Sequence, residues 1–301
     1  MGEKSEIHVP ENLEGFLSGE VLDEYACRAP DQAIRQLQLY LDEASFFYPS
    51  VKKLIDEVKP ATILEVGSGV GLLSLLMSEA GARVVSIEPF SAGFRQLEDF
   101  RALLLRAWLG KGDPPHFRSA YVQDLVFEGL RFDLVLAVHV IEHVPKWRDM
   151  LDSIVSVLGE SARAVVICPN YSFPYEQHLE VPIIFSKKLT WFFLGRAVTR
   201  AAVVEQVGEF WADLSWPKVG RIREFLKSRD LRFQFSRALI DRYFDRLLDP
   251  RFLSRKGPFF GFLSSAAFWI RPLSRMVPVR WLPLIELTIE RQTKDVLSDG
   301  R

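Results

Sequence analysis

The sequence predicts an α/β protein with a doubly wound, mostly parallel sheet. From Ala61 onward, strand-like and helix-like periodicities alternate along the chain. The strand-like segments are continuously apolar, which is typical of a sheet covered by helices on both faces. A glycine-rich loop joins the first of these strands to the helix that follows it.

The expected elements follow one another in a regular order. Strands are expected at residues 61–66, 83–87, 119–123, 132–138 and 162–167, with helices at about 71–80, at 94–108 and from about residue 144. Prolines and aromatic residues then predict loops and short helices inserted above the sheet. Regular elements return as a helix at 222–230, a strand at 231–236 and a half-buried strand at 282–292, where Ile285, Leu287 and Ile289 alternate with polar residues.

The pattern predicts one elaborated domain. Residues 1–50 are expected to form a helical N-terminal extension, with residues 24–44 as its clearest segment. Residues 51–301 are expected to form the α/β domain, with the substrate-side insertion at about 170–217.

Composition and charge exclude several classes of protein. The chain of 301 residues carries 39 acidic and 38 basic side chains, so no overall field attracts nucleic acid. Two distant cysteines and a start without an apolar signal core favour a reducing cytoplasm. No apolar run approaches the roughly 20 residues that a membrane-spanning helix needs. We therefore expect a cytoplasmic protein.

The loop after the first strand has the pattern Glu-x-Gly-x-Gly-x-Gly, from Glu65 to Gly71. Such a turn presents backbone N–H groups and lets a ligand approach the main chain. Leu72 occupies the place where a dinucleotide-binding loop needs glycine, so a pyrophosphate cradle is not expected. Glu88 ends the next strand, about 20 residues after the first glycine, where an acid binds the ribose hydroxyls of an adenosine ligand.

With these residues, the chain resembles the class I methyltransferases that use S-adenosylmethionine, over roughly residues 60–170. The resemblance implies a Rossmann-like sheet with an antiparallel last strand. It also implies a set of cofactor-binding residues: Glu65, Gly67, Ser68, Gly69, Gly71, Glu88, Pro89, Asp124, Leu125 and His139. By this likeness the glycine loop holds the methionine part, Glu88 the ribose and Asp124 the adenine. The alternative is that the glycines only make a tight turn.

Three of the five histidines follow the predicted fourth and fifth strands, at whose carboxyl ends such sheets bind ligands. A neutral imidazole can take the proton of an alcohol acceptor as its oxygen attacks the methyl carbon. The motif from His139 to His143 resembles the H-x-x-E-H signature of a branch of glycan and small-molecule O-methyltransferases. We expect Glu142, His143 and His178 to be catalytic. Alternatively, Glu142 stabilises the start of the next helix and His143 only packs there.

The segment after the fifth strand is expected to bind the acceptor. Tyr171, Tyr175, Glu176 and His178 combine aromatic and polar side chains in a proline-rich loop, as an acceptor pocket requires. The alternative is a packing loop whose aromatic rings are core and whose polar groups face water.

No metal is expected. His139 and His143 are four residues apart and would share one face of a helix, but no Asp or Cys completes a ligand set.

Residues 255–285 mix aromatic and basic side chains. One interpretation is a lid packed on the last strands, with Arg271, Arg275 and Arg280 reaching solvent. The other is peripheral contact with anionic lipid, with Trp269 and Trp281 at the interface. The first is favoured because the segment must lead into the closing strand.

The resemblance implies methyl transfer from S-adenosylmethionine to an oxygen, with a sugar or a lipid-linked glycan intermediate as the favoured acceptor. The first alternative is a quinone or small aromatic O-methyltransferase. The second is a non-catalytic module that binds S-adenosylmethionine. A small-molecule or glycan partner is expected, and nucleic acid is not.

Overall fold

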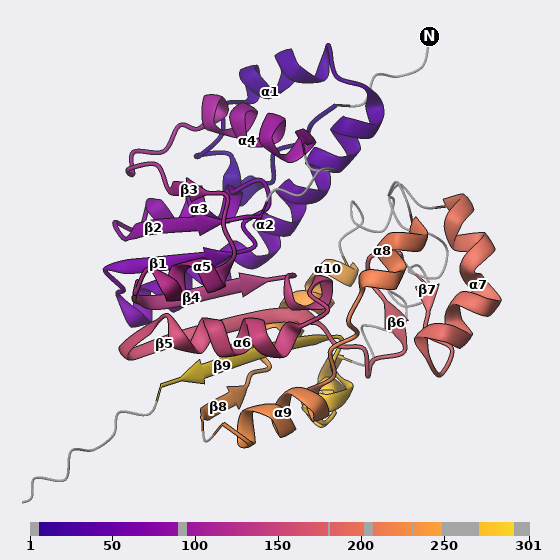
Figure 1. Cartoon of the computed structure of the whole chain (residues 1–301). Coiled ribbons are helices and arrows are strands. Elements are labelled where there is room, and N and C mark those ends of the chain that lie inside the picture. The colour runs from indigo at the N-terminus through magenta and orange to yellow at the C-terminus, as the bar shows by residue number, and fades with distance from the viewer. Residues whose placement is uncertain are drawn as a thin grey trace, which may run out of the picture. The chain divides into compact units, whose positions relative to one another are not determined.

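A computed structural model of the chain describes residues 6–89, 95–179, 181–201, 207–229, 231–248 and 271–291 (Figure 1). The strands are β1 (Thr62–Val66), β2 (Arg83–Ile87), β3 (His116–Arg118), β4 (Phe132–Val138), β5 (Leu158–Pro169), β6 (Tyr175–Glu176), β7 (Val181–Pro182), β8 (Arg232–Phe235) and β9 (Leu284–Glu290). The α-helices are α1 (Gly19–Ala26), α2 (Asp31–Val58), α3 (Leu72–Ser78), α4 (Arg95–Ala107), α5 (Val122–Phe127), α6 (Trp147–Ser156), α7 (Lys187–Ala201), α8 (Val207–Asp213), α9 (Val219–Lys227) and α10 (Ala238–Leu248). Short 3-10 helices are η1 (Glu11–Leu13), η2 (Ile141–His143) and η3 (Val279–Trp281).

Seven strands form one sheet in the order β3-β2-β1-β4-β5-β9-β8. Strand β1 pairs in parallel with β2 and with β4, and β2 pairs in parallel with β3. Strands β8 and β9 are antiparallel. These pairings confirm the predicted doubly wound, mostly parallel sheet with an antiparallel end.

The chain divides into two compact units. Unit 1 comprises Met1–Val138, Asp149–Ala164 and Arg291–Arg301, and unit 2 comprises His139–Arg148 and Val165–Glu290. The glycine loop belongs to unit 1, whereas His139, Glu142, His143 and the residues of the acceptor loop belong to unit 2.

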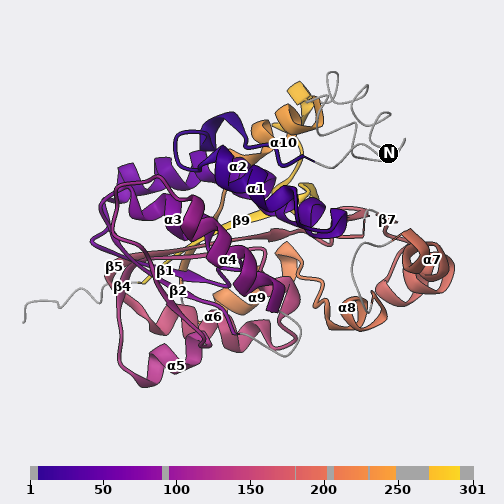
Figure 2. The ribbon, with the colours of Figure 1, turned by 90° about the horizontal axis from the view of Figure 1, so that it is seen from above.

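In unit 1, helices cover both faces of the strands. Figure 2 shows α1 to α4 on one side of β1 and β2, with α5 on the other. Helix α2 packs against α3, and α1 packs against α4. Four of the five residues of β1 are buried, as a strand covered on both faces requires.

The start of β1 is tied to the start of β4 by Asp133. One carboxylate oxygen of Asp133 accepts the backbone N–H groups of Ala61 at 3.0 Å and Thr62 at 2.8 Å, and the Thr62 hydroxyl at 3.0 Å. These bonds fix the register in which Ile63 lies opposite Leu134. Both strands therefore end at the same edge, where the glycine loop begins.

In unit 2, the expected insertion holds more regular structure than predicted. Strands β6 and β7 form a small antiparallel ladder, and α7 packs against β7 and α8 (Figure 1). An aromatic cluster of Tyr171, Trp211 and Trp216 forms its core, with Tyr171 stacked on Trp216 at 4.9 Å between ring centroids. For the rings of Tyr171, Trp211 and Trp216, the structure agrees with the alternative that aromatic side chains of this segment form a packed core.

The strand predicted at 119–123 is wrong. The strand is β3, three residues earlier, and α5 begins at Val122. Asp124 explains the difference, because its carboxylate accepts the Tyr121 backbone N–H at 2.7 Å and so stabilises a helix start rather than a strand.

The N-terminal segment is helical, but it is divided at Pro30, which caps α2 after α1 has ended. Helix α2 then runs across residue 50 to Val58, so the division into a 1–50 extension and a 51–301 domain stays a prediction. Within the described ranges, no helix is both long and apolar enough to cross a membrane.

Residues 255–270 of the aromatic and basic C-terminal segment, and with them Trp269, lie outside the described residues. In the part described, Arg275 and Arg280 are exposed, and Arg271 pairs with Asp245 at 2.6 Å. Trp281 is 50% exposed. Membrane contact through this segment stays a prediction.

Candidate functional site

The glycine loop requires glycine at three positions. Gly67, Gly69 and Gly71 have φ angles of 70°, 51° and 81°, in the left-handed region that other residues rarely adopt. A Cβ atom at Gly71 would also lie 2.3 Å from the ring of Phe117 on β3. Both the turn and the packing against Phe117 therefore exclude a side chain at residue 71.

Glu88 lies directly after β2 and is joined to the loop. Its Oε2 accepts the Gly69 backbone N–H at 2.8 Å. Burial raises the pKa of Glu88, while the Gly69 N–H and the Arg101 guanidinium oppose this shift. Its Oε1 is available to a ribose hydroxyl, since a carboxylate offers two acceptor oxygens. Pro89, also predicted at the site, follows Glu88 and is half-buried.

Arg101 is a site residue that the sequence interpretation missed. It is 8% exposed on α4, donates to the Gly69 carbonyl at 2.5 Å and lies over the Phe117 ring at 4.5 Å from the centroid. The available signal was helical spacing, because Leu97 and Leu104 share its face of α4 and are both buried. Arg101 thus stabilises the glycine loop through its bond to the Gly69 carbonyl and its contact with Phe117.

Glu65 is buried inside unit 1. Its carboxyl group accepts the hydroxyl of Ser74 on α3. Burial raises the pKa of Glu65 to about 8, which the bond to Ser74 opposes. At neutral pH Glu65 is therefore mostly protonated and can donate a hydrogen bond as well as accept one.

The loop fits the cofactor that the resemblance implies. Ser68 is 8% exposed, and its hydroxyl is a buried polar atom with no hydrogen-bond partner in the part of the chain that the structure describes. Buried polar groups usually have partners, so a ligand atom at this turn would satisfy the hydroxyl. Ser68, Gly69 and Glu88 together would hold a nucleoside with an amino-acid arm.

Asp124 and Leu125 lie in the first turn of α5. Leu125 is fully buried, and Asp124 makes the helix-start bond to Tyr121 described above. The implied role of Asp124 beside the adenine stays a prediction.

In unit 2 five residues form what we call the histidine cluster: His139, Glu142, His143, Glu176 and His178. The centroids of the His143 and His178 rings are 4.9 Å apart, and those of His139 and His178 are 6.2 Å apart. Both carboxylates are completely buried. The structure therefore brings together all three predicted catalytic residues, and adds His139 and Glu176.

His178 is oriented by Glu176. Its Nδ1 lies 2.7 Å from Glu176 Oε1, while Glu176 also accepts the Tyr171 hydroxyl at 3.1 Å and the Leu179 N–H at 2.6 Å. Burial alone would raise the pKa of Glu176, but His178 and the backbone N–H groups hold it below its usual value. Glu176 is therefore an anion that accepts a hydrogen bond from Nδ1–H, which leaves the lone pair on Nε2.

Glu142 faces the same ring from the other side. Its Oε1 lies 3.8 Å from His178 Nε2 and 4.0 Å from His143 Nε2. The carboxylate belongs to the histidine cluster, and η2 ends at His143 before α6 begins at Trp147. Glu142 therefore lies against the two imidazoles and five positions before the first residue of α6, whose start the alternative would have it stabilise.

The backbone holds this arrangement in place. His139 has a φ of 55° and donates its N–H to the Ile167 carbonyl at 2.8 Å. Ser215 binds η2 through its N–H to the Glu142 carbonyl at 2.7 Å and its hydroxyl to the Ile141 carbonyl at 2.9 Å. His139 lies outside η2, so the helical pairing of His139 with His143 that was considered for a metal does not occur.

The two predicted acceptor-binding tyrosines are largely buried, at 2% exposed for Tyr171 and 6% for Tyr175. Burial and the neighbouring Glu176 raise the pKa of Tyr171, so its hydroxyl stays a donor. The ring of Tyr175 packs in a separate cluster with Ile240 and Phe244. Direct contact of either ring with an acceptor stays a prediction.

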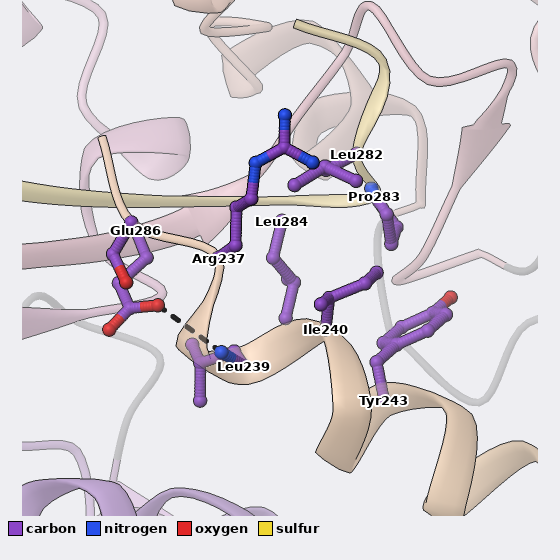
Figure 3. A pocket seen from close by; sticks show the side chains of 9 residues that line it. Arg237, Leu239, Ile240, Tyr243, Leu282, Pro283, Leu284 and Glu286 are labelled. Atoms are coloured by element: carbon purple, nitrogen blue, oxygen red, sulfur yellow. Dashed lines mark hydrogen bonds between the residues drawn. The ribbon is translucent and has the colours of Figure 1, made fainter. Parts of the chain in front are cut away.

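A pocket of unit 2, separate from the predicted site residues, lies at the start of α10 (Figure 3). Glu286 of β9 lines it and accepts the Leu239 N–H at 3.3 Å. Burial raises the pKa of Glu286, against the N–H groups that it accepts. Glu286 therefore caps the start of α10, and this role explains the buried carboxylate without a bound ligand.

A mostly parallel α/β sheet whose first strand leads through a glycine loop into a helix is the arrangement of the Rossmann-like nucleotide-binding proteins. The family described as a methyltransferase domain matches residues 33–232, and the chain belongs to that family. It is a class I methyltransferase, and its cofactor is S-adenosylmethionine.

Individual relatives are more distant. The uncharacterized protein Rv1509 of Mycobacterium tuberculosis (strain ATCC 25618 / H37Rv) is 27% identical over 236 residues, which cover 77% of this chain and 79% of that protein. A ubiquinone biosynthesis O-methyltransferase of Methylobacterium sp. (strain 4-46) is 32% identical over 83 residues, 28% of this chain and 30% of that protein. The crystal structure of the plantazolicin methyltransferase BamL in complex with a triazolic desmethylPZN analog and SAH has 11% identity and a TM-score of 0.49, covering 86% of this chain and 91% of that one.

Proposed function

We propose that the chain is an O-methyltransferase that acts on a hydroxyl group of a sugar or of a lipid-linked glycan intermediate. The observation that carries this proposal is the histidine cluster, where buried carboxylates hold two imidazoles in contact with each other. An alcohol has to lose a proton as its oxygen attacks, and imidazole is the side chain suited to accept it near neutral pH. The resemblance of the H-x-x-E-H motif to glycan O-methyltransferases supports the acceptor class.

When bound, S-adenosylmethionine supplies an electrophilic methyl group and leaves as S-adenosylhomocysteine. The acceptor oxygen forms the new C–O bond, the C–S electron pair stays on sulfur, and the hydroxyl proton passes to the imidazole pair of His143 and His178. Glu142, within 4.0 Å of both Nε2 atoms, stabilises the positive charge that this proton creates. Glu176 keeps the His178 ring in one orientation.

The test is a turnover assay with the full chain. S-adenosylhomocysteine formation is measured with nucleotide sugars and lipid-linked sugars as acceptors, and cofactor affinity is measured by calorimetry. His143→Ala and His178→Ala are each expected to lower turnover by about 10²–10⁴-fold and to leave cofactor affinity unchanged. His116→Ala on β3, an exposed histidine of unit 1, is the matched control and should change neither quantity.

A quinone or small aromatic acceptor is the second candidate, and the partial likeness to a ubiquinone biosynthesis O-methyltransferase favours it. Turnover with catechol or hydroquinone acceptors but not with sugars would decide for it. A non-catalytic module would bind S-adenosylmethionine and form no product with any acceptor, which would contradict both proposals.

A further inference from the structure

We propose that the histidine cluster binds one divalent transition-metal ion, with His139, Glu142 and His178 as ligands. One ligand atom from each of these residues lies within 4.8 Å of the other two. Ligands about 2.1 Å from a common ion lie at most about 4.2 Å apart, so small side-chain rotations close the site. Two imidazoles and one carboxylate, with a position left open, are typical of a catalytic rather than a structural ion.

The distances between these groups suit a shared cation better than direct hydrogen bonds. His178 Nε2 and Glu142 Oε1 are 3.8 Å apart, beyond the range of about 2.7–3.2 Å for an N–H···O bond. Because Glu176 accepts a hydrogen bond from Nδ1–H at 2.7 Å, Nε2 presents its lone pair on the side of the Glu142 carboxylate. A cation between His178 Nε2 and Glu142 Oε1 would be bound by both atoms.

The surroundings supply the outer contacts of a metal site. A histidine ligand usually donates its other N–H to a carboxylate, which fixes the ring and raises its basicity. Glu176 does this for His178, and Glu176 is held in turn by the Tyr171 hydroxyl and the Leu179 N–H. The left-handed backbone of His139 keeps that ligand in place.

The ligand set selects the kind of ion. Mg²⁺ and Ca²⁺ prefer oxygen ligands, whereas imidazole favours ions such as Zn²⁺ and Co²⁺. With the ion on His178 Nε2, only His143 of the imidazole pair could take the proton of an acceptor hydroxyl bound at the open position, whose pKa the ion would lower. This role rests on the proposed function, whereas binding of the ion does not.

Metal binding is tested on the full chain without cofactor or acceptor. Chelator-treated protein is titrated with Zn²⁺ by calorimetry and with Co²⁺ by its visible ligand-field absorption. One ion per chain is expected. Affinity should fall by about 100-fold or more in His178→Ala and His139→Asn, and by about 10–100-fold in Glu176→Gln, which removes an outer contact.

Two variants serve as controls. His143→Ala and His116→Ala should keep the affinity of the unchanged chain within about threefold, because neither residue is a ligand. Asparagine is chosen at residue 139 because it tolerates the left-handed backbone. If His178→Ala shows no cooperative unfolding transition and is therefore not folded, the metal affinity of His139→Asn decides the test.

Absence of saturable Zn²⁺ or Co²⁺ binding would overturn the proposal, and so would affinity unchanged in both His139→Asn and His178→Ala. Turnover that persists after chelation would refute the catalytic role of the ion and leave the methyltransferase proposal intact. An ion bound as expected in a chain that methylates no alcohol would keep the site and refute the proposed function.

Discussion

Replacing Gly69 by alanine separates the two roles of the glycine loop, the turn and the close approach of a ligand. Gly69 has a φ of 51°, and an added Cβ meets no atom of the described residues within 4 Å. The substitution therefore costs the chain only left-handed strain, about 1–2 kcal/mol of unfolding free energy. A bound nucleoside would meet the new methyl group where it now approaches bare main chain.

Gly81 provides the matched control. It lies between α3 and β2 with a φ of 79°, and its Cβ also meets nothing within 4 Å. Gly81→Ala should lower stability by a similar amount, because the backbone strain is of the same kind. The two variants share the backbone strain, and only residue 69 lies in the loop where the ligand is expected to bind.

The assays are urea unfolding and calorimetric titration with S-adenosylhomocysteine. Gly69→Ala should weaken binding by about tenfold or more, which corresponds to about 1.4 kcal/mol, whereas Gly81→Ala should stay within about twofold of the unchanged chain. Equal affinities in the two variants would refute the argument that the ligand packs against the main chain at residue 69.

Three further predictions concern unit 1. The pKa of Glu65 is about 8 in the folded chain against 4.5 ordinarily, so the contribution of Glu65 to stability is fully present below pH 4.5 and falls by up to about 5 kcal/mol as pH rises to 8. Glu65→Gln should flatten that slope in urea unfolding, and an unchanged slope would contradict the shift. Arg101→Lys should lower the free energy of unfolding by about 1–3 kcal/mol and weaken cofactor binding, because lysine cannot keep both the bond to the Gly69 carbonyl and the contact with the Phe117 ring. Full cofactor affinity in this variant would show that the loop does not need Arg101. Asp133→Ala should cost about 3 kcal/mol, about 1 for each of its three bonds, and a loss below about 1 kcal/mol in chemical unfolding would count against its role in tying β1 to β4.

The sheet and the glycine loop could be predicted because their signals are local. Continuous apolar strands and a loop of three glycines each follow from a physical requirement, and the structure gives those glycines the left-handed backbone that only they adopt readily. The third strand was predicted three residues too late. His116–Arg118 is too short to show a period, and Asp124 starts a helix inside the apolar segment that had been taken for the strand.

The remainder of the site depends on contacts between distant residues. The spacing of Leu97, Arg101 and Leu104 places Arg101 on the buried face of α4, but its contacts with Phe117 and the Gly69 carbonyl come from distant segments of the chain. Likewise, Tyr171 stacks on Trp216, 45 positions further along the chain by their numbers, which no local pattern reports. The polar character of Glu176 and His178 was predicted, but the placement of the His178 ring between Glu176 and Glu142 comes from the fold.

The contact between Gly71 and Phe117 links the loop to the edge of the sheet. An alanine at 71 would fit only if residue 117 lost its ring, since the added carbon would lie 2.3 Å from it. Arg101 would then lose the surface on which its guanidinium rests. Even with a smaller residue at 117, an alanine at 71 would keep the strain of a left-handed backbone, so in a diverging lineage glycine should persist at 71 while residues 101 and 117 change together.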